Sequence, residues 1–496
     1  MEPEYIIVQA GGKGTRLKHL TQNKPKALVP VDNLPLIFHL FRQYPNKKFI
    51  IIADYKKEVL REYLECFATV KYQVVDAEGA GTCAGIGKAL ELFDENVPFI
   101  LIWSDLILPQ GFSLPDGELD CIGISQTFPC RWSYVDGNFL EEKSVKNGVA
   151  GFFSFTDKTK LYDVPQSGEF VRWLQAKRIV LKEISLAGTK EFGILEEYQR
   201  LEVKKCRPFN TITIQDNIVI KEGIDEQGKC LALKECAWYE AVSGKHSILP
   251  KIYSTNPLKM ERIHGKNIYE YSELSYSEKY HILETLVTAL NKLHFSKQVP
   301  ADSFSMKDAY YYKTIKRLNV IRNLVPFADR PTITINGRVC RNIFFHKREL
   351  EQAIDQITCK SFYLIHGDCT FSNMMIREDG TPVLLDPRGY FGHTEIYGDV
   401  LYDWAKLYYS LVGNYDKFNL KEFRLNIAED EISLKIESNN WEDMEELFFQ
   451  LTGVSRHQIR LLHAVIWLSL TTYAWQDYDS ICGAFYNGLY YLEELL

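Results

Sequence analysis

The stretch from Leu364 to Arg388 constrains the fold most, because it spaces three oxygen-bearing side chains around two short apolar runs. Asn373 follows Asp368 by five residues, and Asp386 comes directly after the second apolar run. An Asp-Gly pair between the two runs is a typical hairpin turn. The pattern therefore predicts a loop and a β-hairpin that hold Asp368, Asn373 and Asp386 close together.

Three such oxygens suit phosphoryl transfer from a nucleotide. Asp368 is the predicted base, or orienting group, for an attacking hydroxyl, and Asn373 and Asp386 are the predicted ligands of Mg²⁺. The plainer alternative is an ordinary loop in which Asp386 caps a turn. The combined spacing favours the phosphoryl-transfer site.

The pattern HGDxxxxN followed by LLDPRG resembles the aminoglycoside phosphotransferase and choline kinase superfamily, and the resemblance runs from about Arg207 to the C-terminus. It implies a bilobal, protein-kinase-like α+β domain that transfers phosphate from ATP to a small molecule. The resemblance also implies an adenine-binding hinge near Glu261 and Ile263. No GxGxxG loop is present, which disfavours a protein kinase.

A lysine and a glutamate in the region before the hinge fit the ion pair of a kinase. Lys221 lies in a predicted strand and Glu235 opens a helical stretch fourteen residues later, as expected for a strand lysine that holds nucleotide phosphates. The neighbouring charges Lys234 and Glu222 are alternatives for the two roles. Two ordinary surface charges are the plainer interpretation.

The beginning of the chain carries a second signature. A short apolar strand, Tyr5 to Ala10, runs directly into the sequence GGKGTRL, and PKALVPV begins nine residues after Arg16. A glycine-rich segment after a buried strand lets backbone N–H groups approach an anion, and Lys13 and Arg16 add positive charge. A tight turn between strand and helix is the alternative for the glycines alone.

These two motifs together resemble the signature of sugar-1-phosphate and alcohol-phosphate nucleotidyltransferases. The resemblance implies that the glycine loop with Lys13 and Arg16 grips the triphosphate of an NTP, and that Lys26 helps to hold the attacking phosphate. It implies a second nucleotide-binding loop near the base. The implied nucleotide-binding residues are Gly11, Gly12, Gly14, Thr15, Gly79, Gly81 and Thr82.

Strand and helix patterns alternate through the first third of the chain, which predicts a doubly wound, mostly parallel sheet, similar to a GT-A-like nucleotidyltransferase fold. Asp105 follows the apolar strand Phe99 to Trp103, at the edge where such sheets bind ligands. We expect Asp105 to bind Mg²⁺. The family often has a second metal ligand in a D-x-G motif, where this chain has Glu191; an acid that complements a helix dipole is an equal alternative for Glu191.

Length and composition fit two soluble domains. A chain of 496 residues is too long for one core, and the predicted division is a nucleotidyltransferase domain at 1–205 and a kinase domain at 206–496, with lobes at 206–263 and 264–496. A net charge of −7 argues against nucleic-acid binding. No apolar run is long enough to span a membrane. The 11 cysteines lack metal-site spacing, so we expect reduced thiols in a cytoplasmic protein without a signal peptide.

Two further expectations concern the end of the chain. The family resemblance makes Asp399 an anchor for the catalytic loop and leaves Asp403 to face the substrate. The aromatic residues between His463 and Leu495 are interpreted as helix packing, with an enclosure for a quaternary ammonium group as the alternative.

The two signatures join in sequence, because a kinase makes the phosphate monoester that a nucleotidyltransferase consumes. We therefore expect a bifunctional, Mg²⁺-dependent transferase that phosphorylates a choline-like alcohol with ATP and then converts it with CTP to a CDP-alcohol, releasing pyrophosphate. A role in cell-surface polysaccharide biosynthesis is a fold-level analogy. A sugar or polyol that yields a nucleotide sugar is the alternative acceptor. A third hypothesis makes one domain an inactive scaffold or sensor, and homo-oligomer formation is left open.

Overall fold

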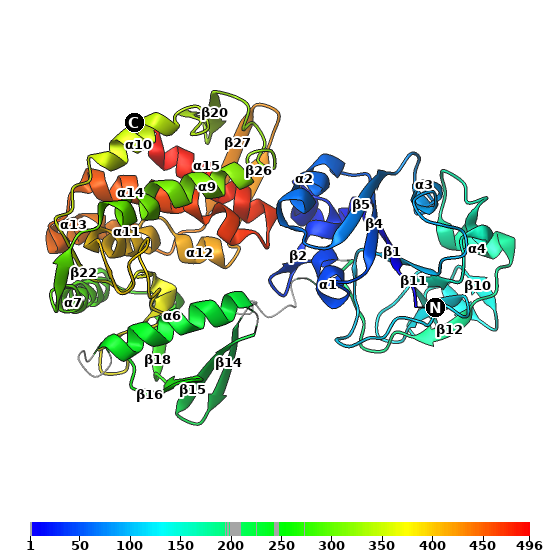
Figure 1. The fold of residues 1–496 in the computed structure, drawn as a ribbon, viewed down its shortest axis with the longest axis horizontal. Coiled ribbons are helices and arrows are strands. Elements are labelled where there is room, and N and C mark those ends of the chain that lie inside the picture. Colours follow the sequence, from blue (N-terminus) through cyan, green and yellow to red (C-terminus); the bar gives the residue numbers. More distant parts are fainter. Residues whose placement is uncertain are drawn as a thin grey trace. The chain divides into compact units, whose positions relative to one another are not determined.

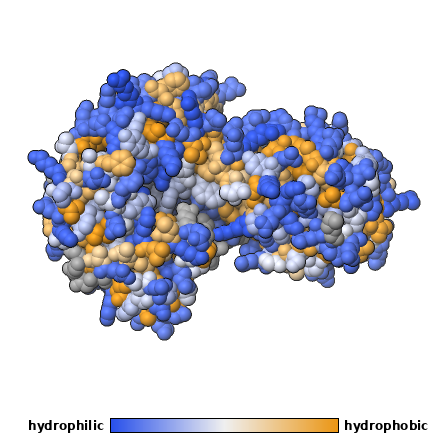
Figure 2. All heavy atoms as spheres, viewed as in Figure 1, coloured by the Kyte–Doolittle hydropathy of each residue, from blue (hydrophilic) through white to orange (hydrophobic). Residues whose placement is uncertain are grey.

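The computed structural model describes residues 2–193, 195, 198, 210–224, 226–242, 248–271 and 273–496. It divides into an N-terminal unit, Met1–Glu202 with Gln476–Tyr478, and a C-terminal unit, Val203–Trp475 with Asp479–Leu496. Hydrophilic residues dominate the visible face of each unit, with hydrophobic residues scattered among them (Figure 2). The predicted junction at 199–209 lies outside the described residues, so the domain limits 1–205 and 206–496 stay predictions. Among the described helices, none combines the length and apolarity that a membrane crossing requires.

A nine-stranded sheet organises the N-terminal unit (Figure 1). Its main order is β10-β9-β11-β6-β1-β4-β5, and β8 and β12 extend it from β11. The strands are β1 (Tyr5–Gln9), β4 (Lys48–Ala53), β5 (Lys71–Asp76), β6 (Phe99–Trp103), β8 (Cys121–Ser125), β9 (Ser133–Val135), β10 (Asn138–Leu140), β11 (Gly148–Phe155) and β12 (Lys182–Ser185). The four strands β5, β4, β1 and β6 are parallel, as a doubly wound sheet requires. Antiparallel β11 makes the far side of the sheet mixed.

Four α-helices in the described part of this unit are α1 (Leu36–Gln43), α2 (Lys57–Phe67), α3 (Ile86–Leu90) and α4 (Phe170–Lys177). Their apolar faces complete the core around the buried runs of β1, β4 and β6, because these strands are covered on both faces. On α2, Tyr63 packs against Phe38 of α1 and against Phe67, with ring centroids 5.8 and 5.0 Å away.

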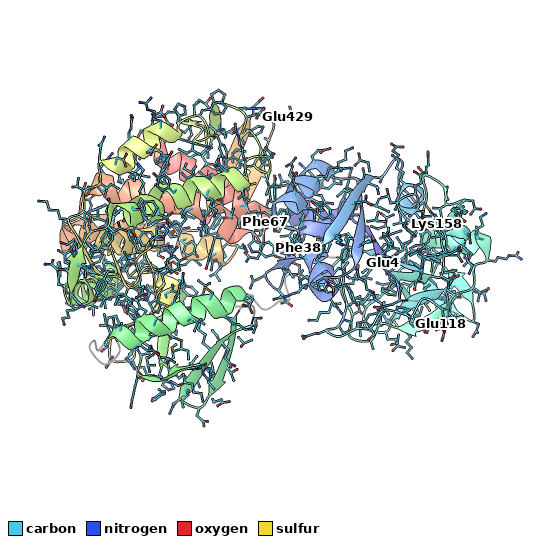
Figure 3. All side chains as sticks on the ribbon, viewed as in Figure 1. Glu4, Phe38, Phe67, Glu118, Lys158 and Glu429 are labelled. Carbon is cyan, nitrogen blue, oxygen red and sulfur yellow. The ribbon has the colours of Figure 1, made fainter. Side chains whose placement is uncertain are left out.

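The sequence pattern predicts a helix from Thr82 to Phe93, but helix α3 spans only Ile86–Leu90. Gly85 just before it has a φ of +81°, so the helix begins only at Ile86. At its other end the buried Lys158 donates a hydrogen bond to the Leu90 carbonyl oxygen at 2.7 Å, which satisfies a group that the ending helix leaves unpaired (Figure 3).

The C-terminal unit begins with an antiparallel sheet beside a long helix. The strands β14 (Asn210–Gln215), β15 (Ile218–Gly223), β16 (Ile252–Thr255) and β17 (Leu258–Glu261) pair in the order β14-β15-β17-β16, next to α6 (Glu226–Val242). Two three-stranded sheets follow: β18-β23-β24, from Gly265–Asn267, Met374–Arg377 and Pro382–Leu384, and β19-β22-β25, from Gln298–Pro300, Ser361–Leu364 and Tyr397–Gly398. The hairpin expected after Asp368 is the pair β23 and β24.

Most of the remaining part of this unit is helical (Figure 1). They are α7 (Tyr276–His294), α8 (Ser303–Lys307), α9 (Lys313–Val320), α10 (Lys347–Asp355), α11 (Val400–Leu411), α12 (Tyr415–Asn419), α13 (Glu445–Thr452), α14 (Arg456–Leu470) and α15 (Tyr478–Leu492). A further sheet, β21-β20-β27-β26, joins β20 (Thr332–Ile335) and β21 (Arg338–Arg341) to β26 (Phe423–Ile427) and β27 (Glu431–Ile436). This sheet was not predicted from the sequence.

Candidate active sites

The predicted loops of the N-terminal unit leave the same edge of its sheet. Strands β1 and β6 are parallel neighbours with Gln9 opposite Trp103, so the glycine loop and Asp105 begin side by side. Gly14 in this loop has a φ of +61°, which L side chains rarely adopt. A Cβ atom there would lie 3.2 Å from the Cβ atom of Lys26. The glycine therefore lets the loop pack closely against the segment that carries Lys26.

Lys26 and Asp105 form an ion pair through Nζ and Oδ2, although they are 79 residues apart in the chain. The other carboxylate oxygen of Asp105, Oδ1, is buried and has no hydrogen-bond partner in the described part of the chain. Such an oxygen fits a metal ligand. The described residues contain no group of three or more His, Cys, Asp or Glu side chains that could hold a metal. One carboxylate nevertheless fits Mg²⁺, which keeps waters and takes the remaining ligands from substrate phosphates.

Glu191 lies next to Asp105 through a short strand pair. Strand β7 (Leu106–Ile107) is antiparallel to β13 (Lys190–Glu191), and the amide of Phe192 donates to the Asp105 carbonyl oxygen at 3.0 Å. Glu191 and Arg16 also line one cavity of about 480 Å³, a size that suits a small ligand. The other lining residues are Pro129, Cys130, Arg131, Glu141 and Lys143.

The charged residues Arg131, Glu141 and Lys143 of this cavity were not predicted from the sequence. Arg131, Glu141 and Lys143 come from the segment around β9 and β10, which carries no motif. Glu141 is engaged by Arg131 and by Arg172, the latter at 2.7 Å, and their hydrogen bonds lower its pKa. Glu141 and Arg131 are thus paired, and the other charged side chains that line the cavity are Arg16, Lys143 and Glu191.

The remaining nucleotide-binding candidates of this unit lie in two places. Gly12, Lys13, Thr15 and Arg16 are exposed on the glycine loop, as an anion-binding loop requires, and the Nζ atom of Lys13 lies 5.9 Å from the ring centroid of Tyr55. Thr82 is tied to the end of β1, because its carbonyl oxygen accepts a hydrogen bond from the Gln9 side chain at 2.7 Å. Gly79 and Gly81 pack against the backbone at 166–168, too closely for any Cβ atom.

In the C-terminal unit one lysine joins two candidate residues. Lys221 on β15 lies 2.7 Å from Glu235 Oε2 on α6 and 2.9 Å from Asp386 Oδ1, which follows β24. Lys221 is buried and both carboxylates raise its pKa against the effect of burial. Burial raises the pKa of Glu235 to about 7, although Lys221 acts to lower it. The alternative Lys234 instead places its Nζ atom 4.2 Å from the ring centroid of Tyr390.

Asp368 and Asn373 contact each other directly. The side-chain amide of Asn373 donates to the Asp368 carbonyl oxygen and to Asp368 Oδ2, both at 2.9 Å. The Nζ atom of Lys406 lies 3.0 Å from Asp368 Oδ1. The Leu385 amide donates to the Asn373 carbonyl oxygen at 2.9 Å, which fixes the start of the Asp386 turn beside this pair. Asp386 has a φ of +56°, an uncommon conformation for a residue other than glycine and one that clusters at functional sites.

The loop that carries Asp368, residues 366–373 (the catalytic loop), is fixed by hydrogen bonds from its own amides. Asp403 on α11 accepts from the amides of His366 at 2.8 Å and Gly367 at 2.7 Å, and from the His294 ring at 2.9 Å. Four more loop amides donate as follows: Thr370 to Asp368, Phe371 to Ser410, Ser372 to Asp416 and Asn373 to Thr370. The acceptors outside the loop come from two helices.

The predicted roles of Asp399 and Asp403 are therefore wrong. Asp403 is fully buried and anchors the catalytic loop, so it does not face a substrate. Asp399 instead caps α11, accepting from the Leu401 amide at 3.1 Å and from the Tyr310 hydroxyl at 2.9 Å. The two acids are one helical turn apart, and which of them contacts the catalytic loop depends on tertiary packing rather than on local sequence.

Two other candidates differ from the expected surroundings. The Glu261 amide donates to the Lys251 carbonyl oxygen at 2.8 Å, and the Glu261 carboxylate lies 2.6 Å from Arg377, so both groups have partners within the protein. Ile263 is buried, and the nucleotide-binding role of the two residues stays a prediction. Among the late aromatic residues, Trp467, Phe485 and Tyr486 have no exposed surface and pack in the core, which agrees with the helix-packing interpretation. These rings cannot enclose an ammonium group.

Comparison with known proteins identifies the class of the N-terminal unit. Residues 5–114 match the family described as nucleotidyl transferase. The chain is 40% identical over 62 residues to the UTP–glucose-1-phosphate uridylyltransferase AglF of Haloferax volcanii, which covers 12% of this chain and 26% of that protein. It is 32% identical over 101 residues to the D-glycero-alpha-D-manno-heptose 1-phosphate guanylyltransferase of Campylobacter jejuni, covering 19% and 45%. The N-terminal unit thus has sugar-phosphate nucleotidyltransferases as homologues, and the chain spans less than half the length of these curated relatives.

Solved structures give similar matches. The inositol-1-phosphate CTP transferase from T. maritima is matched at a TM-score of 0.34 and 16% identity, over 40% of this chain and 92% of that one. The CTP:phosphocholine cytidylyltransferase LicC from Streptococcus pneumoniae is matched at a TM-score of 0.30 and 22% identity, over 40% and 96%.

Proposed function

We propose that the N-terminal unit transfers a nucleotidyl group from an NTP to a phosphate monoester. An oxygen of the monoester attacks the α-phosphorus, and the bond to the β-phosphate oxygen breaks, so that pyrophosphate leaves. The family match over residues 5–114 and the meeting of the glycine loop, Lys26 and Asp105 at one sheet edge support this proposal. Lys26 and Arg16 would position the two phosphate groups and offset their charge. Asp105, with Glu191 beside it, would hold Mg²⁺, which supplies further positive charge to the phosphates.

We propose that the C-terminal unit phosphorylates a small alcohol with ATP. The alcohol oxygen attacks the γ-phosphorus, its proton passes to Asp368, and ADP leaves. The observation that carries this proposal is the network in which Lys221 contacts Glu235 and Asp386 while Asn373 contacts Asp368. Lys221 would hold the nucleotide phosphates, and Asn373 and Asp386 would hold Mg²⁺.

The two reactions together would make a nucleotide-linked product. A CDP-alcohol from a choline-like acceptor is one version, and a nucleotide sugar from a sugar or polyol is the other. The homologues of the N-terminal unit, whose names specify sugar phosphates, favour the second version. The full burial of Trp467, Phe485 and Tyr486 makes these three rings unavailable to choline, whereas Tyr473, Trp475, Tyr490 and Tyr491 are partly exposed. CTP, UTP and other NTPs are all candidates for the second step.

A screen of alcohols and sugars with ATP and each NTP tests both activities, read separately as ADP and pyrophosphate. Asp368→Asn should abolish ADP formation and leave pyrophosphate release from a supplied phosphate monoester, and Asp105→Asn should do the reverse. Matched controls are Asp379→Asn and Asp136→Asn, at exposed turn positions of the two units. Loss of both activities in either variant would contradict independent sites. A unit that turns over none of the substrates tested would instead be assigned the role of a scaffold or sensor.

A further inference from the structure

Four cationic side chains gather beside Asp368. They are Lys313 and Arg317 on α9, Arg388 after β24, and Lys406 on α11, and we call them the basic cluster. Both helices pack on α14 (Figure 1). Lys406 pairs with Asp368 at 3.0 Å. In the described part of the chain, the other three cations form no ion pair with a carboxylate, although each is at least half-buried.

Tyrosine rings and the catalytic loop hold the basic cluster in place. Arg388 donates hydrogen bonds to the hydroxyl of Tyr390 at 2.9 Å and to that of Tyr402. The Nζ atom of Lys313 and the Cζ atom of Arg388 lie 5.5 and 5.7 Å from the ring centroid of Tyr402, so one ring is shared by two cations. The Arg388 amide donates to the His366 carbonyl oxygen at 2.8 Å, which ties the cluster to the loop of Asp368.

A small cavity opens onto this cluster. It measures about 30 Å³, room for one or two waters, and its polar lining comes from Asp308, Lys313, Arg388, Tyr390 and Tyr402. Asp308 is its only carboxylate, and the His393 ring lies 3.6 Å from it. A site of this composition has an excess of positive charge next to the predicted base.

The pKa values of Lys313, a cluster member, and of Tyr390, which binds Arg388, reflect this excess of positive charge. Burial lowers the pKa of Lys313 well below its ordinary value, and the nearby Arg388, Arg317 and Lys406 lower it further. Burial acts to raise the pKa of Tyr390, but Arg388 and the other cations hold it below the ordinary value. Arg317 donates to the Ser469 carbonyl oxygen, but in the described part of the chain Lys313, Arg317 and Arg388 have no carboxylate partner. Partly desolvated cations without a counter-charge are costly, which favours a site for an anion.

We propose that the basic cluster binds an anionic group of the kinase acceptor, so that the acceptor is an alcohol that also carries a carboxylate or a phosphate. This inference rests on the proposed kinase function. A quaternary ammonium acceptor such as choline would meet three like charges. Arg388 supplies a guanidinium group, which carboxylate and phosphate groups prefer, and it keeps N–H donors beyond the two that bind Tyr390 and Tyr402. Arg317 adds positive charge, and a bound anion would favour the protonated form of Lys313. Asp368 then lies on the side of the bound acceptor that carries the hydroxyl.

The test compares acceptors that differ in charge. ADP release is measured with glycerate, glycerol 3-phosphate, glycerol and choline, and the two anions distinguish a carboxylate from a phosphate. We expect kcat/KM for the better anion to exceed that for glycerol and choline by about 10- to 100-fold, the value of a charge-assisted contact. Equal or better use of choline or glycerol would overturn the proposal.

Variants on α9 connect the preference to the cluster. Lys313→Met and Arg317→Gln should raise KM for the anionic acceptor at least about 10-fold and leave KM for ATP within about 2-fold. Lys316→Met is the matched control, since this lysine is exposed on the same helix. A rise in KM for ATP with an unchanged acceptor KM would assign the cations to the nucleotide phosphates and refute the proposal.

A binding measurement separates this proposal from the kinase function. Glycerate and glycerol 3-phosphate are titrated by calorimetry into the full chain with Mg²⁺ and a non-hydrolysable ATP analogue. Binding that Lys313→Met weakens, in the absence of any turnover, would support the anion site and reject the kinase. Absence of both binding and turnover would reject both.

Discussion

The buried carboxylate of Asp403 offers the sharpest test of how the catalytic loop is held. It accepts hydrogen bonds from the His366 amide, the Gly367 amide and the His294 ring, and it has no exposed surface. Asp403→Ala would leave three buried donors without an acceptor. Each such donor costs about 1–3 kcal/mol, and breaking a buried charged pair costs about 3–5 kcal/mol in all. We therefore expect the C-terminal unit to lose about 3–5 kcal/mol of unfolding free energy.

The assay is urea unfolding combined with hydrogen exchange of peptides that cover 361–377. Exchange should rise within the catalytic loop, and ADP release should fall at least about 100-fold because Asp368 is displaced. Pyrophosphate release should not change. Asp399→Ala is the comparison, because this acid is also buried but accepts from the Leu401 amide and the Tyr310 hydroxyl rather than from the catalytic loop, so exchange at 361–377 should not change. Asp403→Asn keeps the shape and one acceptor oxygen, so it should recover part of the loss. Equal unfolding free energies for Asp403→Ala and the parent, with unchanged exchange at 361–377, would refute this account.

Three further predictions concern single positions. Lys26→Met should reduce pyrophosphate release at least about 100-fold without affecting ADP release, and comparable loss of both products would contradict separate sites. Burial raises the pKa of Asp416 to about 6, so between about pH 4 and 6 the folded chain keeps a proton that the unfolded chain has lost, and rising pH destabilises the folded chain. The unfolding free energy of Asp416→Asn relative to the parent should therefore increase by about 1.4 kcal/mol per pH unit in this window and stay constant above it. Urea titrations at several pH values measure this difference. Gly151→Ala should lower unfolding free energy by about 2–5 kcal/mol, because φ is +83° and the new Cβ atom would lie 1.9 Å from Trp103 Cε3, whereas Gly87→Ala, with open space around it, should have little effect.

Local patterns were sufficient for the elements that carry the motifs. The apolar runs Tyr5–Gln9 and Phe99–Trp103 are strands because their length and β-branched content suit a buried parallel sheet, and the glycine loop and Asp105 then follow at its edge. The hairpin after Asp368 follows from its Asp-Gly turn. The sheet with β20 and β21 was missed, although Asn336-Gly337 between two alternating segments is a hairpin signal of the same kind.

Other features depend on which surfaces are buried together, which spacing alone does not reveal. Asp399 and Asp403 lie on one helix with the same local pattern, and only packing decides which acid meets the catalytic loop. The basic cluster combines Lys313 and Arg317 with Arg388 and Lys406, from three parts of the chain, and only Arg388 belongs to a motif, LLDPRG. Glu261 was assigned by family resemblance, and its pairing with Arg377 depends on a contact across 116 residues.

The hydrogen bonds of residues 366–373 hold this segment in one conformation as soon as the chain has folded. Its shape is set by main-chain donors that reach acceptors on α11 and α12. The side chains of Cys369 and Phe371 are fully buried, and Phe371 packs against Trp441 with ring centroids 5.1 Å apart. Ordering a residue costs about 1–2 kcal/mol in conformational entropy, and here that cost is met when the chain folds. In the proposed kinase, an incoming substrate would therefore meet side chains that are already immobilised, and its binding energy would remain available for alignment and chemistry.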